Sequence, residues 1–200
     1  MVGETVSLGE VGFSDSVAEK IDGYLAYLLE WNRKIRLTGH DSLSEARTNL
    51  VLDPLFAFLA FQDRLPPGDH FDFGSGNGSP GLVLSILDPL RQYFLIEKTG
   101  KKRAFLEYVR RHLDLRNLEV LPAFSSECLA PTVWMKGITY DDFFLDRPAQ
   151  MFMKPPVRFF RFGLDTHPSC IPVRTYAING TATQWGKNHS LFLLEAVFQG

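Results

Sequence analysis

Residues 71–81 read Phe-Asp-Phe-Gly-Ser-Gly-Asn-Gly-Ser-Pro-Gly, and this stretch decides the fold. An apolar strand runs into glycines at every second position, and Pro80 then opens an apolar run that is typical of a helix. Glycine lets the backbone turn sharply and approach a ligand without a Cβ in the way. The helix that follows points its N-terminal amides back at the loop. The stretch therefore predicts a loop that holds a nucleotide-like cofactor.

Two acidic residues indicate which kind of cofactor the loop holds. Residues Gly76 to Gly81 match the dinucleotide fingerprint G-x-G-x-x-G, and Glu97 follows about 20 residues later, where a ribose-binding acid is expected. Asp72 precedes the first glycine of the loop, Gly74. Dehydrogenases usually have an apolar residue at that position, whereas class I methyltransferases often have an acidic one. A nicotinamide oxidoreductase is a distant alternative, and a glycine turn that only joins strand to helix is another.

The chain is expected to have two parts. The sequence pattern of residues 1–65 predicts a helical extension. Its helices are expected to begin after Ser14, after Ser42 and at Asp53-Pro54. From residue 66 onward strands alternate with helices, which indicates an α/β fold with a mostly parallel sheet. The expected strands are 71–73, 93–97, 118–121 and 143–145, the expected helices are 80–87 and 101–113, and a terminal antiparallel hairpin is expected from 173–178 and 190–198.

Residues 148–172 do not fit this alternation. They contain five prolines and no helical periodicity. A full doubly wound domain would place a helix, a strand and another helix here. We therefore expect residues 66–200 to form a domain of this class that is abbreviated at 148–172.

The composition excludes several classes of protein. With 200 residues, 45% of them hydrophobic and 22% charged, the chain suits a globular domain with a sizeable core. It has no apolar run of roughly 20 residues, and residues 1–10 lack the pattern of a secretion signal. A net charge of -2 excludes a uniformly basic nucleic-acid binder but allows a local basic face. We expect a cytoplasmic monomer with no membrane partner and no metal, because the histidines show no metal-ligand spacing.

Three segments of the chain resemble one bacterial enzyme family. They read Tyr-Leu-Leu-Glu-Trp-Asn-Arg-Lys-Ile-Arg-Leu-Thr at 27–38, Asp-Phe-Gly-Ser-Gly-Asn-Gly-Ser-Pro-Gly-Leu at 72–82, and Leu-Ile-Glu-Lys-Thr-Gly-Lys-Lys-Arg-Ala-Phe-Leu at 95–106. In combination they resemble the 16S rRNA guanine-N7 methyltransferases, also called RsmG or glucose-inhibited division protein B. The resemblance implies a class I methyltransferase (Rossmann-like) fold, S-adenosylmethionine as cofactor, and 16S rRNA or a precursor of the small ribosomal subunit as partner.

The resemblance also assigns cofactor-binding residues. Asp72 would lie near the methionine part, Glu97 would accept hydrogen bonds from the ribose hydroxyls, and Ser125 and Ser126 would meet the adenine. The whole implied set is Asp72, Gly74, Ser75, Gly76, Gly78, Glu97, Lys98, Ser125 and Ser126.

The reaction that the resemblance implies needs little acid–base help. Guanine N7 has an available lone pair and the sulfonium is a strong electrophile, so positioning dominates. Arg147, after the expected strand 143–145, resembles an arginine near the family's active site and is the expected catalytic residue; an ordinary surface role is the alternative. The expected RNA contacts, for which a solvated helix face is the alternative, are Arg33, Lys34, Arg36, Lys101, Lys102 and Arg103.

The C-terminal third of the chain departs from the family pattern. A Gly-Arg-Ala-Glu-like segment of the family reads Ala-Phe-Ser-Ser at 123–126, and beyond residue 127 the likeness nearly vanishes. Two alternatives therefore stay open. One is a non-catalytic member of the fold that binds RNA or protein, and the other is a methyltransferase with a different substrate.

Overall fold

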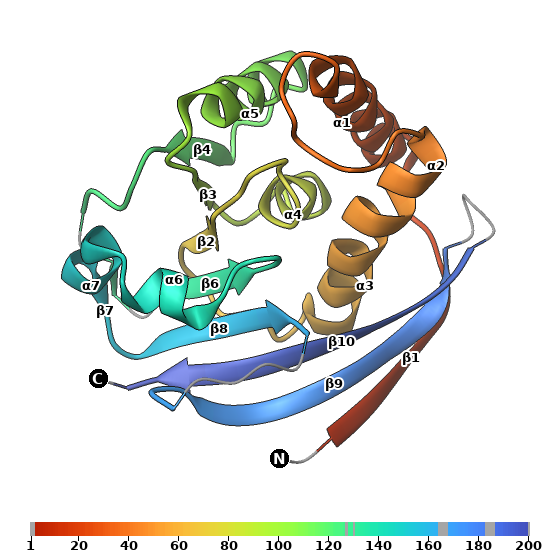
Figure 1. The fold of residues 1–200 in the computed structure, drawn as a ribbon. Helices are drawn as coiled ribbons and strands as arrows, with labels where there is room; N and C mark the ends of the chain where they lie inside the picture. The colour runs from red at the N-terminus through yellow and green to blue at the C-terminus, as the bar shows by residue number, and fades with distance from the viewer. Residues whose placement is uncertain (1–2, 127, 130, 164–167, 183–186, 200) are drawn as a thin grey trace.

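The sheet at the centre of the fold is seen in a computed structural model that describes residues 3–126, 128–129, 131–163, 168–182 and 187–199 (Figure 1). Within the described residues its strands lie in the order β1-β9-β10-β8-β6-β2-β3-β4. Their bounds are β1 (Gly3–Val11), β2 (His70–Phe73), β3 (Tyr93–Ile96), β4 (Leu118–Leu121), β6 (Thr132–Met135), β8 (Val157–Phe162), β9 (Ile171–Ala182) and β10 (Lys187–Phe198). A separate two-stranded sheet pairs β5 (Cys128–Leu129) with β7 (Met153–Lys154).

Most of the strand pairs are parallel. The run β4-β3-β2-β6-β8 is parallel throughout, and so is the pair β1–β9. The antiparallel pairs join β10 to β9 and to β8. The expected strands 71–73, 93–97 and 118–121 and the expected terminal hairpin are confirmed to within a few residues.

Along the chain, most of the helices come before β2 or between β2, β3 and β4. Their bounds are α1 (Asp15–Asn32), α2 (Leu43–Ala46), a π-helical turn η1 (Arg47–Val51), α3 (Leu52–Phe61), α4 (Gly81–Leu87), α5 (Gly100–His112), α6 (Tyr140–Phe144) and α7 (Arg147–Phe152). Ser14 and Ser42 cap α1 and α2 as expected, since their Oγ atoms accept hydrogen bonds from the amides of Val17 and Glu45. Asp53 does not start a new helix, because η1 leads into α3 without a break.

The N-terminal segment differs from the expected helical extension in its first residues. Gly3–Val11 form β1, which pairs in parallel with β9. A strand of this kind is held by a partner more than 160 residues away, from Gly3 to Thr175 at one end of the register, so the local sequence does not reveal it. From α1 to α3 the segment is helical, as expected.

The fourth parallel strand is not the one expected at 143–145. That segment belongs to the end of α6, because Thr139 caps the helix and the Asp142 carboxylate accepts a hydrogen bond from the Thr139 amide. The strand beside β2 is instead β6, whose residues are all buried. Part of 148–172 then supplies α7, β7 and β8, and β8 extends the parallel run by one strand.

Side chains on the two faces of the sheet enter two different core clusters. On β2, Phe71 and Phe73 join the cluster that includes Phe143 of α6 and Ala149 of α7. The larger cluster gathers residues of α1, α3, α4 and α5 with Trp134 of β6. Figure 1 shows α3 and α4 within the curve of the sheet. The N-terminal helices therefore share one core with the sheet.

The first turn of α4 lies unusually close to the central strands. A Cβ added at Gly81 would come within 2.4 Å of the Asp72 Cβ and 2.5 Å of the Leu95 Cδ2. Because these are packed atoms of β2 and β3, neither neighbour has room to yield. Glycine at position 81 therefore sets the spacing between α4 and the sheet.

We predict that Gly81→Ala lowers the free energy of unfolding by about 2–3 kcal/mol, because overpacking outweighs the better helix propensity of alanine. Urea unfolding measures the change. Gly39→Ala is the matched control, because a Cβ there meets no atom within 4 Å. The control should change the free energy of unfolding by less than about 1 kcal/mol, and equal effects of the two variants would contradict the prediction.

Candidate functional site

A pocket of about 260 Å³ lies at the carboxyl ends of β2, β3 and β4. β3, the next strand along the chain, pairs with β2 on one flank, and β6 pairs with β2 on the other. The order of the strands therefore reverses at β2. Ligands of open α/β sheets bind at such switch points. The lining residues are Phe73, Gly74, Ile96, Glu97, Lys98, Thr99, Lys102, Pro122, Ile138, Asp142 and Asp146.

The glycine loop turns in a conformation that favours glycine. Gly74, Gly76 and Gly78 have φ values of 76°, 51° and 100°. At Gly74 a Cβ would also come within 2.9 Å of the Ile138 Cγ2, a side chain that lines the same pocket. The loop therefore presents bare backbone to the pocket at this point.

The carboxylate of Glu97 ties the glycine loop to the end of β3. Its Oε2 accepts a hydrogen bond from the Gly76 amide at 2.9 Å, and its Oε1 accepts one from the Thr99 amide at 2.7 Å. The residue is only 6% exposed and lines the pocket. A carboxylate has about four acceptor positions, so these two amides leave acceptor capacity for a ligand.

Asp72 is a buried anchor beneath the loop. Its Oδ2 accepts a hydrogen bond from the Gly81 amide at 3.0 Å, and the residue is 2% exposed. Burial raises the pKa of Asp72 to about 7, and the charge of Glu97 adds to the increase, while the Gly81 hydrogen bond opposes it. Asp72 therefore fixes α4 against β2 and lies outside the residues that line the pocket.

The N-terminal helices hold the glycine loop from the other side. The Tyr24 hydroxyl of α1 donates to the Asn77 carbonyl at 3.0 Å. The Ser79 hydroxyl donates to the Leu50 carbonyl of η1 at 2.8 Å. These contacts join residues 53 and 29 positions apart, and no local sequence pattern points to either of them.

The pocket brings together some of the expected cofactor-binding residues. Gly74, Glu97 and Lys98 line it. Ser75, Gly76 and Gly78 lie in the same loop, with the Ser75 hydroxyl donating to the Asp72 carbonyl at 2.7 Å. Ser125 and Ser126 follow β4, are exposed, and are not among the lining residues. Of the residues that follow β4, Pro122 lines the pocket.

Arg147 does not follow a strand, in contrast to the expectation. It is exposed in the first turn of α7 and lies outside the lining residues, although its neighbour Asp146 lines the pocket and caps that helix. The basic residue that does follow the fourth parallel strand is Lys136. The expected strand at 143–145 is therefore wrong, and Arg147 lies eleven residues beyond Lys136.

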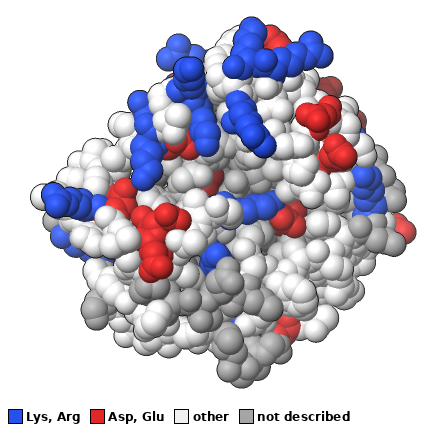
Figure 2. Space-filling view, viewed as in Figure 1, with Lys and Arg blue, Asp and Glu red and all other residues white. Residues whose placement is uncertain are grey.

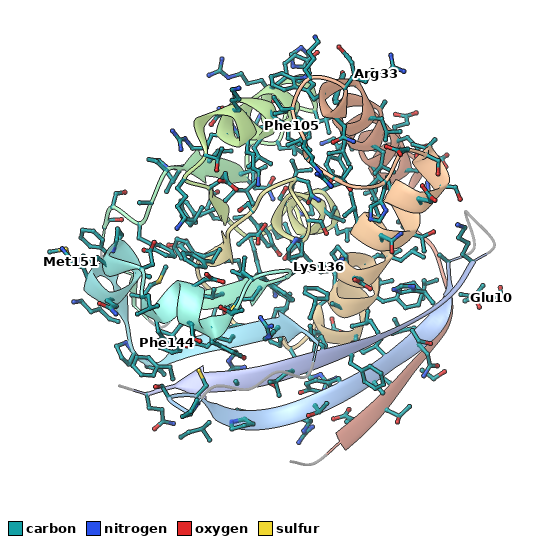
Figure 3. The ribbon with its side chains drawn as sticks, in the orientation of Figure 1. Glu10, Arg33, Phe105, Lys136, Phe144 and Met151 are labelled. Carbon is teal, nitrogen blue, oxygen red and sulfur yellow. The ribbon has the colours of Figure 1, made fainter. Side chains whose placement is uncertain are left out.

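Lys136 belongs to a charged cluster that the sequence did not reveal. Its Nζ lies 2.6 Å from the Asp53 Oδ2 and donates to the Asn49 carbonyl at 2.6 Å, and Figure 3 shows it in the turn after β6. The His189 Nε2 of β10 lies 2.7 Å from the Asp53 Oδ1. Burial raises the pKa of Asp53, but the His189 hydrogen bond and the Lys136 charge outweigh it and hold this pKa below its usual value. The cluster clamps α3 between β6 and β10.

Three further lining residues also escaped the sequence reasoning. Ile138, Asp142 and Asp146 come from the turn and helices after β6. The Thr139-x-x-Asp142 cap was the available signal, because it predicts a helix rather than a strand at this point. The hydrogen bond from the Thr139 amide lowers the pKa of the Asp142 carboxyl.

The expected RNA-contacting residues lie on two neighbouring elements. Arg33, Lys34 and Arg36 follow the end of α1, and Lys101 and Lys102 lie in the first turn of α5. Figure 2 shows Lys and Arg side chains gathered over α1 and α5, and Figure 3 shows Arg33 projecting away from the chain. The sixth residue, Arg103, donates to the backbone carbonyls of Glu97 and Lys98 at 2.9 and 2.7 Å, so its guanidinium supports the pocket rim.

In the part of the chain that the structure describes, no helix is long and apolar enough to span a membrane. Across the same residues, no three His, Cys, Asp or Glu side chains are grouped as metal ligands would be.

Comparisons with known proteins match the N-terminal and central parts of the chain. A family model described as GidB, rRNA small subunit methyltransferase G, matches residues 17–127. The ribosomal RNA small subunit methyltransferase G of Wolinella succinogenes is 40% identical over 111 residues, which are 55% of this chain and 55% of that protein. The protein of the same name from Roseiflexus castenholzii is 40% identical over 105 residues, 52% of this chain and 44% of that protein. The chain thus spans about half the length of the curated relatives it matches.

Solved structures resemble the chain over most of its length. A putative O-methyltransferase from Klebsiella pneumoniae aligns with a TM-score of 0.52 at 12% identity, covering 88% of this chain and 90% of that one. At this identity the likeness concerns the fold alone. It confirms the predicted class I methyltransferase fold.

We predict that Asp72→Asn changes how stability depends on pH. The pKa of Asp72 is about 7 in the folded chain against an ordinary 3.8, so the folded state binds this proton more tightly. The contribution of the group to stability is therefore fully present below the ordinary pKa and is lost as the pH rises through about 7. Relative to the wild type, Asp72→Asn should gain about 3–4 kcal/mol in free energy of unfolding between about pH 4 and about pH 8.

Urea unfolding of both proteins at the two pH values measures this gain. Asp63→Asn is the control, because Asp63 is an exposed carboxyl. Its effect should change by less than about 0.5 kcal/mol between the two pH values. A difference between Asp72→Asn and the wild type that stays constant with pH would show that the pKa of Asp72 is the same in the folded and the unfolded chain.

Proposed function

Because this chain belongs to the GidB family of rRNA small subunit methyltransferase G proteins, we propose that it transfers a methyl group from S-adenosylmethionine to guanine N7 of 16S rRNA. The observation that carries the proposal is the Glu97 carboxylate, which is buried beside the glycine loop and lines a pocket at the switch point of the sheet. That is the place and the residue type that a ribose-binding site needs.

The residues of the pocket fit this cofactor. Glu97 has acceptor capacity for two ribose hydroxyls, and Gly74, which has no side chain, also lines the pocket. Ile96, Pro122 and Ile138 offer apolar surface to an adenine ring. Carboxylates and lysines both line the pocket, as suits a ligand with an amino group, a carboxylate and a sulfonium; they are Glu97, Asp142, Asp146, Lys98 and Lys102.

The chain's own part in the reaction is to bind, orient and exclude water. S-adenosylmethionine supplies an electrophilic methyl group when bound. Guanine N7 needs no deprotonation to attack it, so alignment of the two reactants accounts for most of the acceleration. The loop is held rigid for this purpose by Glu97 on one side and by Tyr24 and Ser79 on the other.

The remaining site residues are part of the same proposal. Asp72 and the loop glycines position the methionine end, and Ser125 and Ser126 approach the adenine once the ligand is bound. Arg147 is proposed as the catalytic residue, acting on the RNA at the rim beside Asp146. The basic residues after α1 and at the start of α5 contact the RNA backbone. The chain acts as a cytoplasmic monomer, with residues 1–65 as an extension of the domain at 66–200.

Two measurements on the unaltered protein test the proposal. Calorimetry with S-adenosylmethionine and S-adenosylhomocysteine should show binding, and small ribosomal subunits that lack their native N7-methylguanine should accept a methyl group. No binding at millimolar ligand would overturn the cofactor site. Binding without transfer to rRNA would favour a non-catalytic protein or another substrate.

We predict that Glu97→Gln weakens the binding of S-adenosylhomocysteine about 10- to 100-fold, because one charged acceptor is replaced by a group whose NH₂ faces an amide donor. Calorimetry gives the dissociation constant. Glu119→Gln is the matched control, since Glu119 is exposed on the neighbouring strand β4. If both variants bind like the wild type, Glu97 does not hold the ribose.

We also predict that Arg147→Ala lowers the rate of methyl transfer to rRNA at least about tenfold and leaves the affinity for S-adenosylhomocysteine unchanged, because the residue acts on the RNA and not on the cofactor. Single-turnover transfer and calorimetry separate the two effects. Arg116→Ala, at another exposed arginine, should change neither quantity. A normal rate for Arg147→Ala would show that the Arg147 side chain is an ordinary surface residue with no part in methyl transfer.

A further inference from the structure

A shallow groove lies between α1 and α5, outside the pocket described above. It consists of two adjoining hollows of about 420 and 350 Å³. Both hollows are lined by Trp31 of α1 and by Ala104 and Tyr108 of α5. We call it the α1–α5 groove, and its other lining residues are Glu30, Lys34, Ile35, Lys101, Glu107, Arg111 and His112.

Aromatic rings form the floor of the α1–α5 groove. The ring centroids of Trp31 and Tyr108 are 5.3 Å apart, and the His112 ring stacks on Tyr108 at 3.8 Å. Trp31 also packs at 5.8 Å against Phe105, which is fully buried. Trp31 and Tyr108 are themselves half-buried, so their rings are fixed by packing on one side and accessible on the other.

Cations stand at both ends of the aromatic floor. Lys34 and Lys101 line one hollow, and Arg111 lines the other. Two carboxylates also line the groove, Glu30 in the first hollow and Glu107 in the second. Glu107 is paired with Arg110 at 3.0 Å and with Arg111 at 3.5 Å, so two arginines offset its charge, and one of them, Arg111, lines the second hollow. Figure 2 shows the surrounding face of α1 and α5 rich in Lys and Arg.

The α1–α5 groove lies beside the pocket at the switch point. Lys101 lines the groove, and the next residue, Lys102, lines the pocket. The groove and the pocket therefore adjoin the same first turn of α5. A chain that enters the pocket with one residue has its neighbouring residues within reach of the groove.

We propose that the α1–α5 groove binds an unpaired nucleotide of single-stranded RNA next to the nucleotide that enters the pocket. The base stacks on the Trp31 and Tyr108 rings, and the flanking phosphates lie against Lys34 and Lys101 at one end and Arg111 at the other. Rings between cations match the alternation of base and phosphate along an RNA strand, and stacking of this kind tolerates any base. A protein partner would have no need of cations at both ends. The inference rests on the proposed function only in taking RNA as the substrate class.

Ala104→Glu tests the groove directly. Ala104 is exposed and lines both hollows, so a glutamate there fills the groove and repels phosphate. Ala26→Glu is the matched control, because Ala26 is exposed on α1 outside both hollows and carries the same substitution on a helix surface. The probe is a fluorescein-labelled single-stranded RNA of mixed sequence, and fluorescence anisotropy gives its dissociation constant.

We expect Ala104→Glu to weaken RNA binding about tenfold and Ala26→Glu to weaken it less than about twofold. An RNA of equal length with abasic sites should bind the wild type about tenfold more weakly than the complete strand, and Ala104→Glu should weaken the binding of abasic RNA less than it weakens the binding of the complete strand. This second comparison uses the unaltered protein, so it remains decisive if the variant does not fold.

The test separates this inference from the proposed function. Calorimetry with S-adenosylhomocysteine should give the same affinity for Ala104→Glu as for the wild type, since Ala104 does not line the pocket. A wild type that binds RNA through the groove but transfers no methyl group would overturn the proposed function and support the groove. Equal RNA binding by the two variants, or by abasic and complete RNA, would overturn the groove and leave it as a surface for another occupant.

Discussion

The hydrogen bond from the Gly81 amide to the buried carboxylate of Asp72 fixes α4 against the central strand, and the site depends on that spacing. A helix this close to β2 leaves the glycine loop only a tight path, which it follows through three residues of positive φ. The loop then presents the Gly76 amide to Glu97 at the end of β3. Two carboxylates on neighbouring strands thus divide the work: Asp72 holds the helix, and Glu97 holds the loop and lines the pocket.

Features encoded within a short stretch of the chain were predictable from the sequence. The glycine loop, the caps at Ser14 and Ser42 and the position of Glu97 beside the loop each depend on residues that are close neighbours or one strand apart. Features held by distant partners were not. β1 depends on β9, and β6 depends on pairing with β2, to which no local pattern points. The error at 143–145 was a different one, since the Thr139 cap was visible and the apolar run outweighed it.

The candidate site repeats this division. Gly74 and Glu97 come from the half of the chain that resembles its relatives, and they line the pocket as expected. Ile138, Asp142 and Asp146 come from beyond residue 127, where the likeness fades, and only the parallel pairing of β6 with β2 brings them to the same edge. Eight of the eleven lining residues therefore lie within the family match at 17–127, and three lie beyond it.

The pairing of β1 with β9 has a consequence for the order of folding. Gly3 to Val11 leave the ribosome well before their partners, Thr175 to Ala182, are made, because more than 160 residues separate the two strands. Until then the backbone groups of β1 have no neighbouring strand to pair with. The glycine loop, α4 and α5 already have the neighbours against which they pack. The core of the sheet is thus free to form during synthesis, and its outermost strand docks last. A segment made before the core is thus the one that completes this edge of the sheet.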